Sequence, residues 1–224
     1  MDKSVETVAE ALADIKDGAT VMLSGFQGSG AANALIQALI ETGVRGLTVI
    51  SNGTGHHGST QAKLVETGRV VKVVCSSARG RGSEQTPFEK LLEKGDIELE
   101  LVPQGVFAER IRAGGAGIPA FFTPVAADTD LADGKERRVL NGRDCVLETA
   151  LTADFTLLRA ERADRYGNLT YRGTQANFGP VMATAGAITV AEVTEVVDTG
   201  TLNPAAVRTP GIFVDRVIAL PDLR

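Results

Sequence analysis

The sequence contains no tryptophan, and aromatic residues make up only 4% of its 224 positions. Such a scarcity disfavours stacking on sugar rings or nucleobases as the main mode of ligand recognition. The two cysteines, Cys75 and Cys145, are too few for a disulfide framework and are typical of a reducing compartment. We therefore expect a cytoplasmic protein that is not held together by disulfides.

Membrane segments and basic surfaces are missing as well. No apolar run reaches the roughly 18 to 20 residues of a membrane helix, and the first residues do not resemble a signal peptide. Lys and Arg number 23 against 28 Asp and Glu, and the two signs are interspersed, which argues against nucleic acid as a partner. The length and the absence of a linker or internal repeat predict a single domain over residues 1–224.

Apolar runs alternate with helical patterns through the first half of the chain. The predicted strands are Ala19–Leu23, Leu47–Ile50, Val70–Cys75 and Ile97–Val102. The predicted helices cover Val5–Ile15 and Asn33–Glu41, with two more that end at Gly68 and Gly95. This order predicts an α/β fold with an open, largely parallel sheet that helices cover on both faces.

The second half has a different pattern. Asn141-Gly142 separates Arg138–Leu140 from Cys145–Glu148, which is the signature of a β-hairpin. Further strands are expected at Phe155–Arg159 and at Ala187–Val190, the second after an apolar helical stretch. The C-terminal part therefore contains a hairpin in addition to parallel strands.

A glycine-rich loop, Ser24-Gly25-Phe26-Gln27-Gly28-Ser29-Gly30, follows the first predicted strand. It precedes a helix for which Asn33 is the expected N-cap, and this arrangement is a common cradle for phosphate groups. The glycine order differs from the dinucleotide fingerprint G-x-G-x-x-G, and no Gly-Lys-Ser/Thr triphosphate loop is present. A tight turn without a ligand remains the alternative.

Ligands of open α/β sheets bind at the carboxyl ends of the strands. The loops expected there contain Gly, Ser, Asn or Gln but no evident nucleophile and base; they are Gly25–Gly30, Ser51–Ser59, Ser76–Ser83, Pro103–Gly105 and Gly114–Pro124. The only histidines, His56 and His57, are better interpreted as a solvated loop tip than as a general base or a ligand contact. Cys75 is interpreted as a buried hydrophobic residue, and no acidic cluster predicts a metal site.

Charged residues near the predicted loops have two interpretations. Arg79 and Arg81 follow the third strand and could pair with a substrate carboxylate, but a solvated basic loop explains them equally well. Three Glu-x-Gly sequences end at Gly43, Gly68 and Gly95, where glycine is expected to stop a helix in the left-handed conformation. The glutamates of these sequences are therefore not predicted to be catalytic.

Three segments resemble the A subunit (alpha subunit) of the family I CoA-transferases, the 3-oxoacid CoA-transferase type. The first is Asp17-Gly18, the apolar Val21–Leu23, and the loop from Ser24 to Ala32. The second is a long block from Leu101-Val102-Pro103-Gln104-Gly105 to Thr123-Pro124. The third comprises Asp154-Phe155, Asp164–Leu169 and Asn177-Phe178. The resemblance spans nearly the whole chain.

The resemblance implies a reaction that moves CoA from an acyl-CoA to a free carboxylic acid through a glutamate of a partner chain, the B subunit. It implies no catalytic residue in this chain, no permanently bound cofactor, and an α2β2 assembly. Acyl-CoA is a substrate, and the loop from Ser24 to Gly30 is implied to bind it. Gln104 and Arg79 are the candidates for positioning the acyl group, and Gly114–Gly117 permits close approach of the partner or ligand, or simply ends a helix.

Several positions depart from the family pattern. Ser24 and Ala32 replace a glycine and a proline of the signature, Asp128 lies where a glycine-rich segment is usual, and Ala176 replaces an arginine. Overall similarity and the arginines at 79 and 81 favour succinyl-CoA and 3-oxoadipate as substrates. The alternatives are an acetoacetate-type transferase (the acetate/butyrate kind) and a non-catalytic acyl-CoA-binding paralogue. A sugar-phosphate isomerase would need acid–base carboxylates in the strand-end loops, which offer few.

Overall fold

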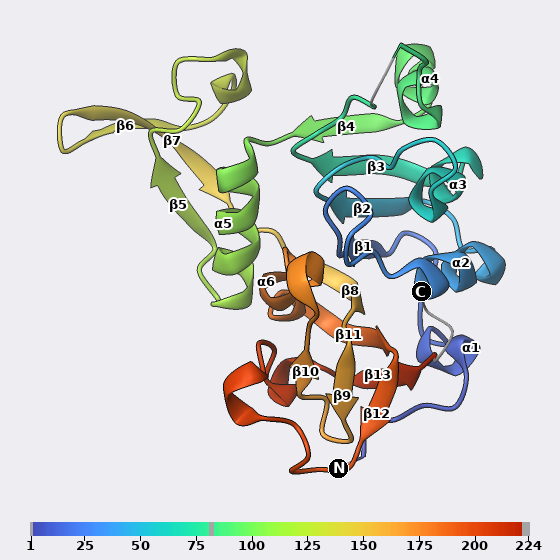
Figure 1. Ribbon diagram of the computed structural model, residues 1–224. Coiled ribbons are helices and arrows are strands. Elements are labelled where there is room, and N and C mark those ends of the chain that lie inside the picture. The colour runs from blue at the N-terminus through green and yellow to red at the C-terminus, as the bar shows by residue number, and fades with distance from the viewer. Residues whose placement is uncertain (1, 81–82, 221–224) are drawn as a thin grey trace.

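The computed structural model describes residues 2–80 and 83–220, and a seven-stranded sheet forms its centre (Figure 1). Every strand pair in this sheet is parallel. The strands in spatial order are β13 (Arg216–Ala219), β11 (Gly186–Val193), β8 (Ala153–Arg159), β1 (Thr20–Leu23), β2 (Leu47–Ser51), β3 (Val70–Cys75) and β4 (Glu98–Leu101). The predicted parallel α/β architecture is confirmed.

Helices cover both faces of the sheet, as predicted (Figure 1). They are α1 (Val8–Ala11), α2 (Asn33–Thr42), α3 (Thr60–Glu66), α4 (Pro87–Lys94), α5 (Gln104–Gly115) and α6 (Gly179–Ala183). One hydrophobic cluster joins Val21 and Leu23 to α2, α3 and α4, whereas the neighbouring Met22 belongs to a second cluster with α5 and α6. Successive side chains of β1 therefore enter opposite cores, which explains its continuous apolar sequence.

Two small sheets flank the large one. One contains β10 (Leu169–Thr170), β9 (Arg162–Asp164) and β12 (Glu195–Val197). The other contains β5 (Ala120–Thr123), β7 (Arg143–Thr149) and β6 (Arg137–Leu140); it projects from the molecule, and we call it the arm (Figure 1). Short 3-10 helices are η1 (Asp130–Ala132), η2 (Gly173–Gln175), η3 (Pro204–Ala206) and η4 (Gly211–Phe213). The hairpin predicted around Asn141-Gly142 is confirmed by β6 and β7.

The glycine helix stops are confirmed. Gly43 and Gly95 are left-handed C-caps of α2 and α4, and Gly68 has a φ of 67° just after α3. The first predicted helix, Val5–Ile15, is wrong in length because α1 covers only Val8–Ala11. The first residues of the predicted helix are extended, because the Val5 N–H donates to the carbonyl of Val217 in β13. After α1 the backbone forms turns in which each N–H bonds to the carbonyl three residues earlier.

The predicted loop Gly114–Pro124 is too long, because its first two residues belong to α5 and Ala120–Thr123 forms β5, which leaves 116–119 and Pro124 outside these elements. Gly114 and Gly115 form the last turn of α5, and a Cβ on either would collide with the Leu151 carbonyl or the Thr184 side chain. Close approach at these glycines thus serves packing within this chain. Ala120–Thr123 pairs with β7, a long-range contact that its own sequence does not reveal.

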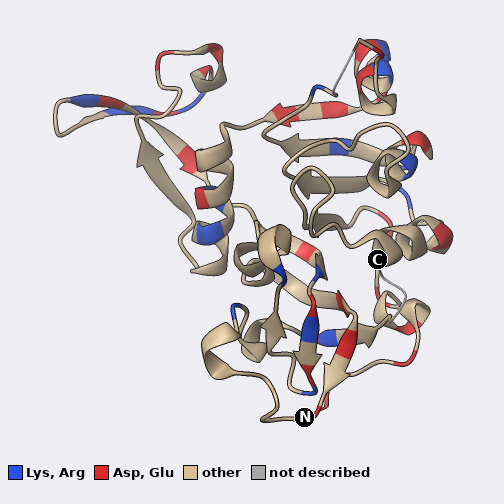
Figure 2. Cartoon of the chain, in the orientation of Figure 1, with Lys and Arg blue, Asp and Glu red and all other residues tan. Residues whose placement is uncertain are grey.

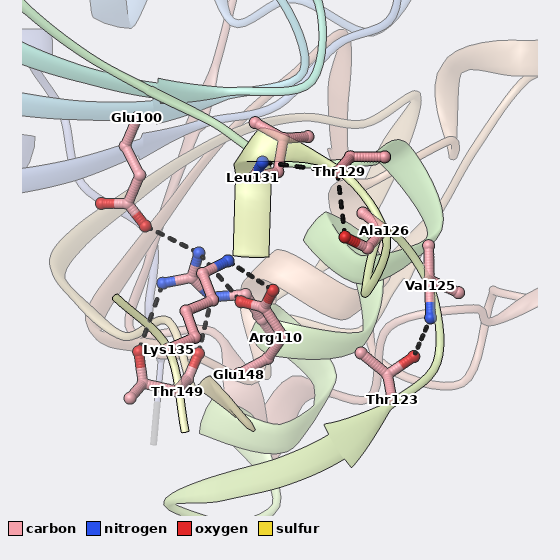
Figure 3. A network of polar contacts seen from close by, with 10 residues as sticks. All are labelled: Glu100, Arg110, Thr123, Val125, Ala126, Thr129, Leu131, Lys135, Glu148 and Thr149. Carbon is pink, nitrogen blue, oxygen red and sulfur yellow. Dashed lines mark hydrogen bonds and ion pairs between the residues drawn. The ribbon is translucent and has the colours of Figure 1, made fainter. Parts of the chain in front are cut away.

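Arg110 fixes α5 to its surroundings (Figure 3). Its guanidinium is 2.7 Å from Glu100 of β4 and 3.8 Å from Glu148 of the arm, and its Nε donates to the Thr149 carbonyl at 2.6 Å. Lys135 pairs with the same Glu148 at 2.6 Å. This buried network holds α5, the edge strand and the base of the arm together.

Candidate functional site

The carboxyl ends of the sheet strands gather the candidate residues. Strand order runs from β1 to β4 on one side and through β8, β11 and β13 on the other, so the sheet has a topological switch point between β1 and β8. Ligands of open parallel sheets bind outside the strand ends at such a point. Ser24–Gly30, which we call the glycine loop, follows β1 and therefore lies at the switch point (Figure 1).

The tip of the glycine loop is a tight two-residue turn. Phe26 and Ser29 exchange backbone hydrogen bonds of 2.9 and 3.0 Å, and Gln27 and Gly28 between them have φ angles of 52° and 90°. These values are typical of a type I′ turn. A Cβ on Gly28 would meet nothing closer than His56 Cε1 at 3.9 Å, so the exposed backbone at the tip is open to a ligand.

Ser24 closes the base of the loop. Its hydroxyl donates to the Gly30 carbonyl at 2.6 Å and accepts the Arg159 backbone N–H at 3.2 Å. The serine that replaces the family's glycine is therefore buried and forms two hydrogen bonds at the base of the loop. These bonds connect the loop to the end of β8 on the other side of the switch point.

A second segment, residues 173–177, supports the loop from outside. Asn177 Nδ2 donates to the Ser29 carbonyl at 2.8 Å, and the hydroxyls of Ser29 and Thr174 lie 2.8 Å apart. Gly30 packs so closely that a Cβ there would collide with the backbone of this segment. Ala176 is buried within it, so the position where the family usually has arginine is packed beside the glycine loop.

The prediction that Asn33 caps α2 is wrong. Asn33 is the first helical residue, and the N-cap is Ala32, which has no side-chain acceptor. The N–H groups of Ala34 and Leu35 instead donate to Glu192 Oε2, both at 2.9 Å. The donors that the sequence assigned to a phosphate are thus already occupied by a carboxyl group of the protein, so the ligand-accessible part of the cradle is the tip of the loop.

Glu192 lies on β11 directly opposite Arg159 of β8 and has no exposed surface. Its Oε1 is 3.4 Å from Arg159 Nη1. Burial raises the pKa of the Glu192 carboxyl, although the two helix N–H groups and Arg159 oppose this shift. Sequence reasoning missed Glu192 because nothing near it in the chain marks it as the cap of a helix that begins at Asn33.

Gln104 is the first residue of α5. Its predicted place in a loop is therefore wrong. Its Nε2 donates to Asn52 Oδ1 at 2.8 Å, and Ser76 donates to the same oxygen at 2.9 Å. Three polar side chains from the ends of β2 and β3 and the start of α5 therefore meet at the sheet edge. Asn52 was missed; its position directly after a buried strand was the only available signal.

Arg79 lies apart from this amide cluster. It is exposed and lines a shallow groove of about 410 Å³ with six other residues: Ala78, Ser83, Glu84, Gln85, Glu89 and Leu92. Backbone hydrogen bonding at Thr86 lowers the pKa of Glu89, and the charge of Arg79 adds to this effect. The role of Arg79 in positioning a substrate stays a prediction, and Arg81 lies outside the described residues.

The remaining candidate residues are two histidines and a cysteine, and their surroundings agree with the structural interpretations predicted for them. His56 and His57 are exposed, in agreement with a loop tip, although His56 lies beside Gly28. Cys75 is fully buried, and burial raises the pKa of its thiol to about 11, so it behaves as a hydrophobic residue. Between positions 18 and 40 the sequence has no charged residue, so the glycine loop itself offers a ligand only backbone groups and neutral side chains.

Acidic residues are spread among basic ones rather than gathered at the switch point (Figure 2). The buried carboxylates, Glu148, Asp164 and Glu192, all have hydrogen-bond partners within the fold. Within residues 2–80 and 83–220, no group of three or more His, Cys, Asp or Glu is placed to hold a metal ion. The same residues contain no helix of the length and apolarity that crossing a bilayer requires.

The fold belongs to the class of open parallel sheets whose members bind small metabolites at the strand ends, and the glycine loop and the amide cluster lie at those ends. Residues 5–220 match the family model described as Coenzyme A transferase, and the chain belongs to this family. The resemblance of the three sequence segments is therefore confirmed.

Two similar proteins of known name are A subunits of CoA-transferases. Over 220 residues the chain is 49% identical to the A subunit of 3-oxoadipate CoA-transferase from Pseudomonas putida, and the match covers 98% of this chain and 94% of the relative. It is 47% identical over 212 residues to the A subunit of succinyl-CoA:3-ketoacid coenzyme A transferase from Xanthomonas campestris pv. campestris, covering 94% and 86%.

A solved structure shares the fold. The acyl-CoA transferase of Escherichia coli O157:H7, in a thioester complex with CoA, superimposes with a TM-score of 0.84 at 24% identity. The match covers 100% of this chain but 48% of that protein, so this chain corresponds to about half of it.

Proposed function

We propose that this chain is the A subunit of a two-chain CoA-transferase that moves CoA from an acyl-CoA, with succinyl-CoA as the favoured donor, to a 3-oxo acid such as 3-oxoadipate. The observation that carries the proposal is the 49% identity to the corresponding chain of a 3-oxoadipate CoA-transferase over nearly the full length. The open glycine loop and the Gln104–Asn52 pair at one sheet edge support it.

The chemistry requires a carboxylate nucleophile that this chain does not supply in our proposal. The partner chain, the B subunit, supplies a glutamate that attacks the thioester carbonyl, the CoA thiolate leaves, and an acyl–glutamyl anhydride forms. The thiolate then attacks the glutamyl carbonyl and releases the donor acid, which leaves a glutamyl-CoA thioester. The carboxylate of the acceptor repeats the two steps in reverse, so the new acyl-CoA forms and the glutamate is regenerated.

This chain would bind and orient the reactants. The backbone at Gln27 and Gly28 faces the acyl-CoA, and the uncharged residues of the loop suit the amide-containing arm of CoA. Gln104 has one amide hydrogen fixed on Asn52. Its other amide hydrogen and its oxygen have no hydrogen bond in the described part of the chain, so they are free to orient the acyl carbonyl or carboxylate.

Assay of the reconstituted pair tests this proposal. The chain is produced with its B subunit, and the pair is supplied with succinyl-CoA and a panel of 3-oxo acids that includes 3-oxoadipate and acetoacetate. We expect CoA transfer only when both chains are present, with 3-oxoadipate giving the highest kcat/KM. A full rate from this chain alone would contradict the division of labour, and a preference for acetoacetate would favour the 3-ketoacid relatives as the functional guide.

An α2β2 assembly and a cytoplasmic location complete the proposal. The free cysteines Cys75 and Cys145 support a reducing compartment. Mass measurement of the native complex distinguishes α2β2 from a simple αβ pair. If the pair binds acyl-CoA but transfers none to any acceptor, the chain is a non-catalytic binding paralogue.

A further inference from the structure

Glu192 is a buried carboxyl group whose position is unusual for the element on which it lies. It belongs to β11, the interior strand beside the edge strand β13, has no exposed surface, and accepts two N–H groups from the first turn of α2. A buried carboxyl group is costly unless it is well paired. Here the partners are the N-terminus of α2, whose dipole favours a negative charge, and the guanidinium of Arg159 at 3.4 Å.

The same arginine also reaches the other end of the glycine loop. Its backbone N–H donates to the Ser24 hydroxyl, which in turn donates to the Gly30 carbonyl. Ser24 begins the loop, and α2, held by Glu192, follows it. Ser24, Arg159 and Glu192 thus form a connected chain of contacts that fixes both ends of one short loop.

The loop needs such support because one of its residues, Gln27, has the left-handed backbone that only glycine adopts without strain. Gly25, Gln27, Gly28 and Gly30 all have positive φ angles, and Gln27 at 52° is not a glycine. Left-handed backbone of this kind persists only where the surroundings over-determine it. Ala32 offers no side-chain cap to the following helix, so the support comes from another strand.

We propose that Glu192 is a positioning residue that, through Arg159 and the N-terminus of α2, holds the glycine loop in the conformation that binds acyl-CoA. This inference rests on the proposed function for the identity of the ligand. Glu192 touches no substrate, and its carboxyl group takes the place that a ligand anion would have at the helix N-terminus. Loss of the carboxyl group would therefore loosen the loop and weaken binding of acyl-CoA without slowing the chemical steps.

The test uses the two-chain enzyme with Glu192→Ala and Glu192→Gln. Glutamine keeps one oxygen acceptor but not the charge, and charge-assisted hydrogen bonds are about twice as strong as neutral ones. Amide hydrogen exchange over residues 25–36 is expected to quicken roughly tenfold or more in the alanine variant, and less in the glutamine variant. KM for succinyl-CoA is expected to rise about five- to tenfold in the alanine variant, with kcat within about twofold of wild type.

Glu148→Gln is the matched control, because Glu148 is also a buried, ion-paired carboxylate but lies in the arm. It should leave both the exchange of residues 25–36 and KM at wild-type values. Wild-type exchange over these residues in Glu192→Gln would overturn the proposal even if the alanine variant fails to fold. Faster exchange with an unchanged KM would overturn the role in binding. If the wild-type pair transfers no CoA, the proposed function fails, whereas the exchange comparison still tests whether Glu192 holds the loop.

Discussion

The side-chain amide of Gln104 donates to Asn52 Oδ1 at 2.8 Å and thereby joins the first residue of α5 to the end of β2. Ser76 donates to the same oxygen, so Asn52 can act only as an acceptor toward both neighbours. This arrangement fixes which end of the Gln104 amide faces Asn52 and leaves the rest of the amide directed toward the sheet edge.

Replacement of Gln104 tests the role of its amide. We expect Gln104→Ala to lower kcat roughly 10- to 100-fold, the effect of losing one hydrogen bond at a reacting group, while assembly with the partner chain stays intact. Asn52→Ala should lower kcat by a smaller factor because Gln104 remains but loses its anchor. Steady-state kinetics of the purified pair gives both values. Gln37→Ala removes an exposed amide from α2 and serves as the control; wild-type kinetics in Gln104→Ala would make Gln104 structural.

Gly28 provides a test of the glycine loop itself. We expect Gly28→Val to weaken binding of CoA about tenfold, because a branched side chain would cover the open backbone at the tip. Gly68 also has a positive φ and open space around it, so Gly68→Val introduces similar backbone strain at the end of a helix. Both variants should lose roughly 1–3 kcal/mol of unfolding free energy. Calorimetric titration with CoA compares them; equal affinity in both variants would place the ligand elsewhere.

The Arg110 network should dominate the stability of the arm junction. Arg110→Ala leaves Glu148 buried with only Lys135 nearby, and we expect a loss of about 3–5 kcal/mol in unfolding free energy. Lys72→Ala removes a partly exposed partner of Glu100 and should cost less than about 1 kcal/mol. Urea unfolding of the isolated chain measures both. Equal losses would show that the buried arginine contributes no more than a surface ion pair.

Local sequence patterns predicted the parts of the fold that local physics determines. The strand Val70–Cys75 was predicted with its observed ends because its residues are apolar except for Lys72, and because Gly68 precedes it and a polar loop follows it. The hairpin at Asn141-Gly142 was predicted because Asn141 and Gly142 both adopt the positive φ that this turn demands. Such features need no knowledge of distant residues.

Distant contacts account for what the sequence did not reveal. The residue type of Asn33 predicts an N-cap there, but the cap is supplied by Glu192, which lies 158 positions after Ala34 and 157 after Leu35. Residues 4 and 5 pair with β13 and do not form helix. Their partner, Val217, again lies near the opposite end of the sequence. The sequence locates the glycine loop as a segment, whereas the residues that contact it come from the end of β8 and from residues 173–177.

Cys75 should be unreactive in the folded protein. Its thiol has a pKa raised to about 11 by burial, so the thiolate is scarce near pH 8, and the side chain is also shielded from reagents. In a Cys145→Ser variant, we expect a thiol reagent such as dithionitrobenzoate to modify Cys75 only on unfolding in denaturant. Absorbance at fixed pH follows the reaction. Rapid labelling of the native variant would contradict the buried position.

The raised pKa of Glu192 predicts how the unfolding free energy depends on pH. Because the folded protein holds this proton more tightly than the unfolded chain, Glu192 contributes stability at low pH that is lost as pH rises from the ordinary value of 4.5 through its raised value. Glu192→Gln cannot titrate at this position. The unfolding free energy of the variant minus that of wild type should therefore increase with pH across this window and become constant above it. Urea unfolding at a series of pH values measures the difference, in which the titrations shared by both proteins cancel. A difference that is constant with pH would mean that Arg159 and the helix N-terminus offset burial, so that the carboxyl ionises as readily in the fold as in the unfolded chain. A difference that decreases with pH would mean that they outweigh burial and that the carboxyl ionises more readily in the fold.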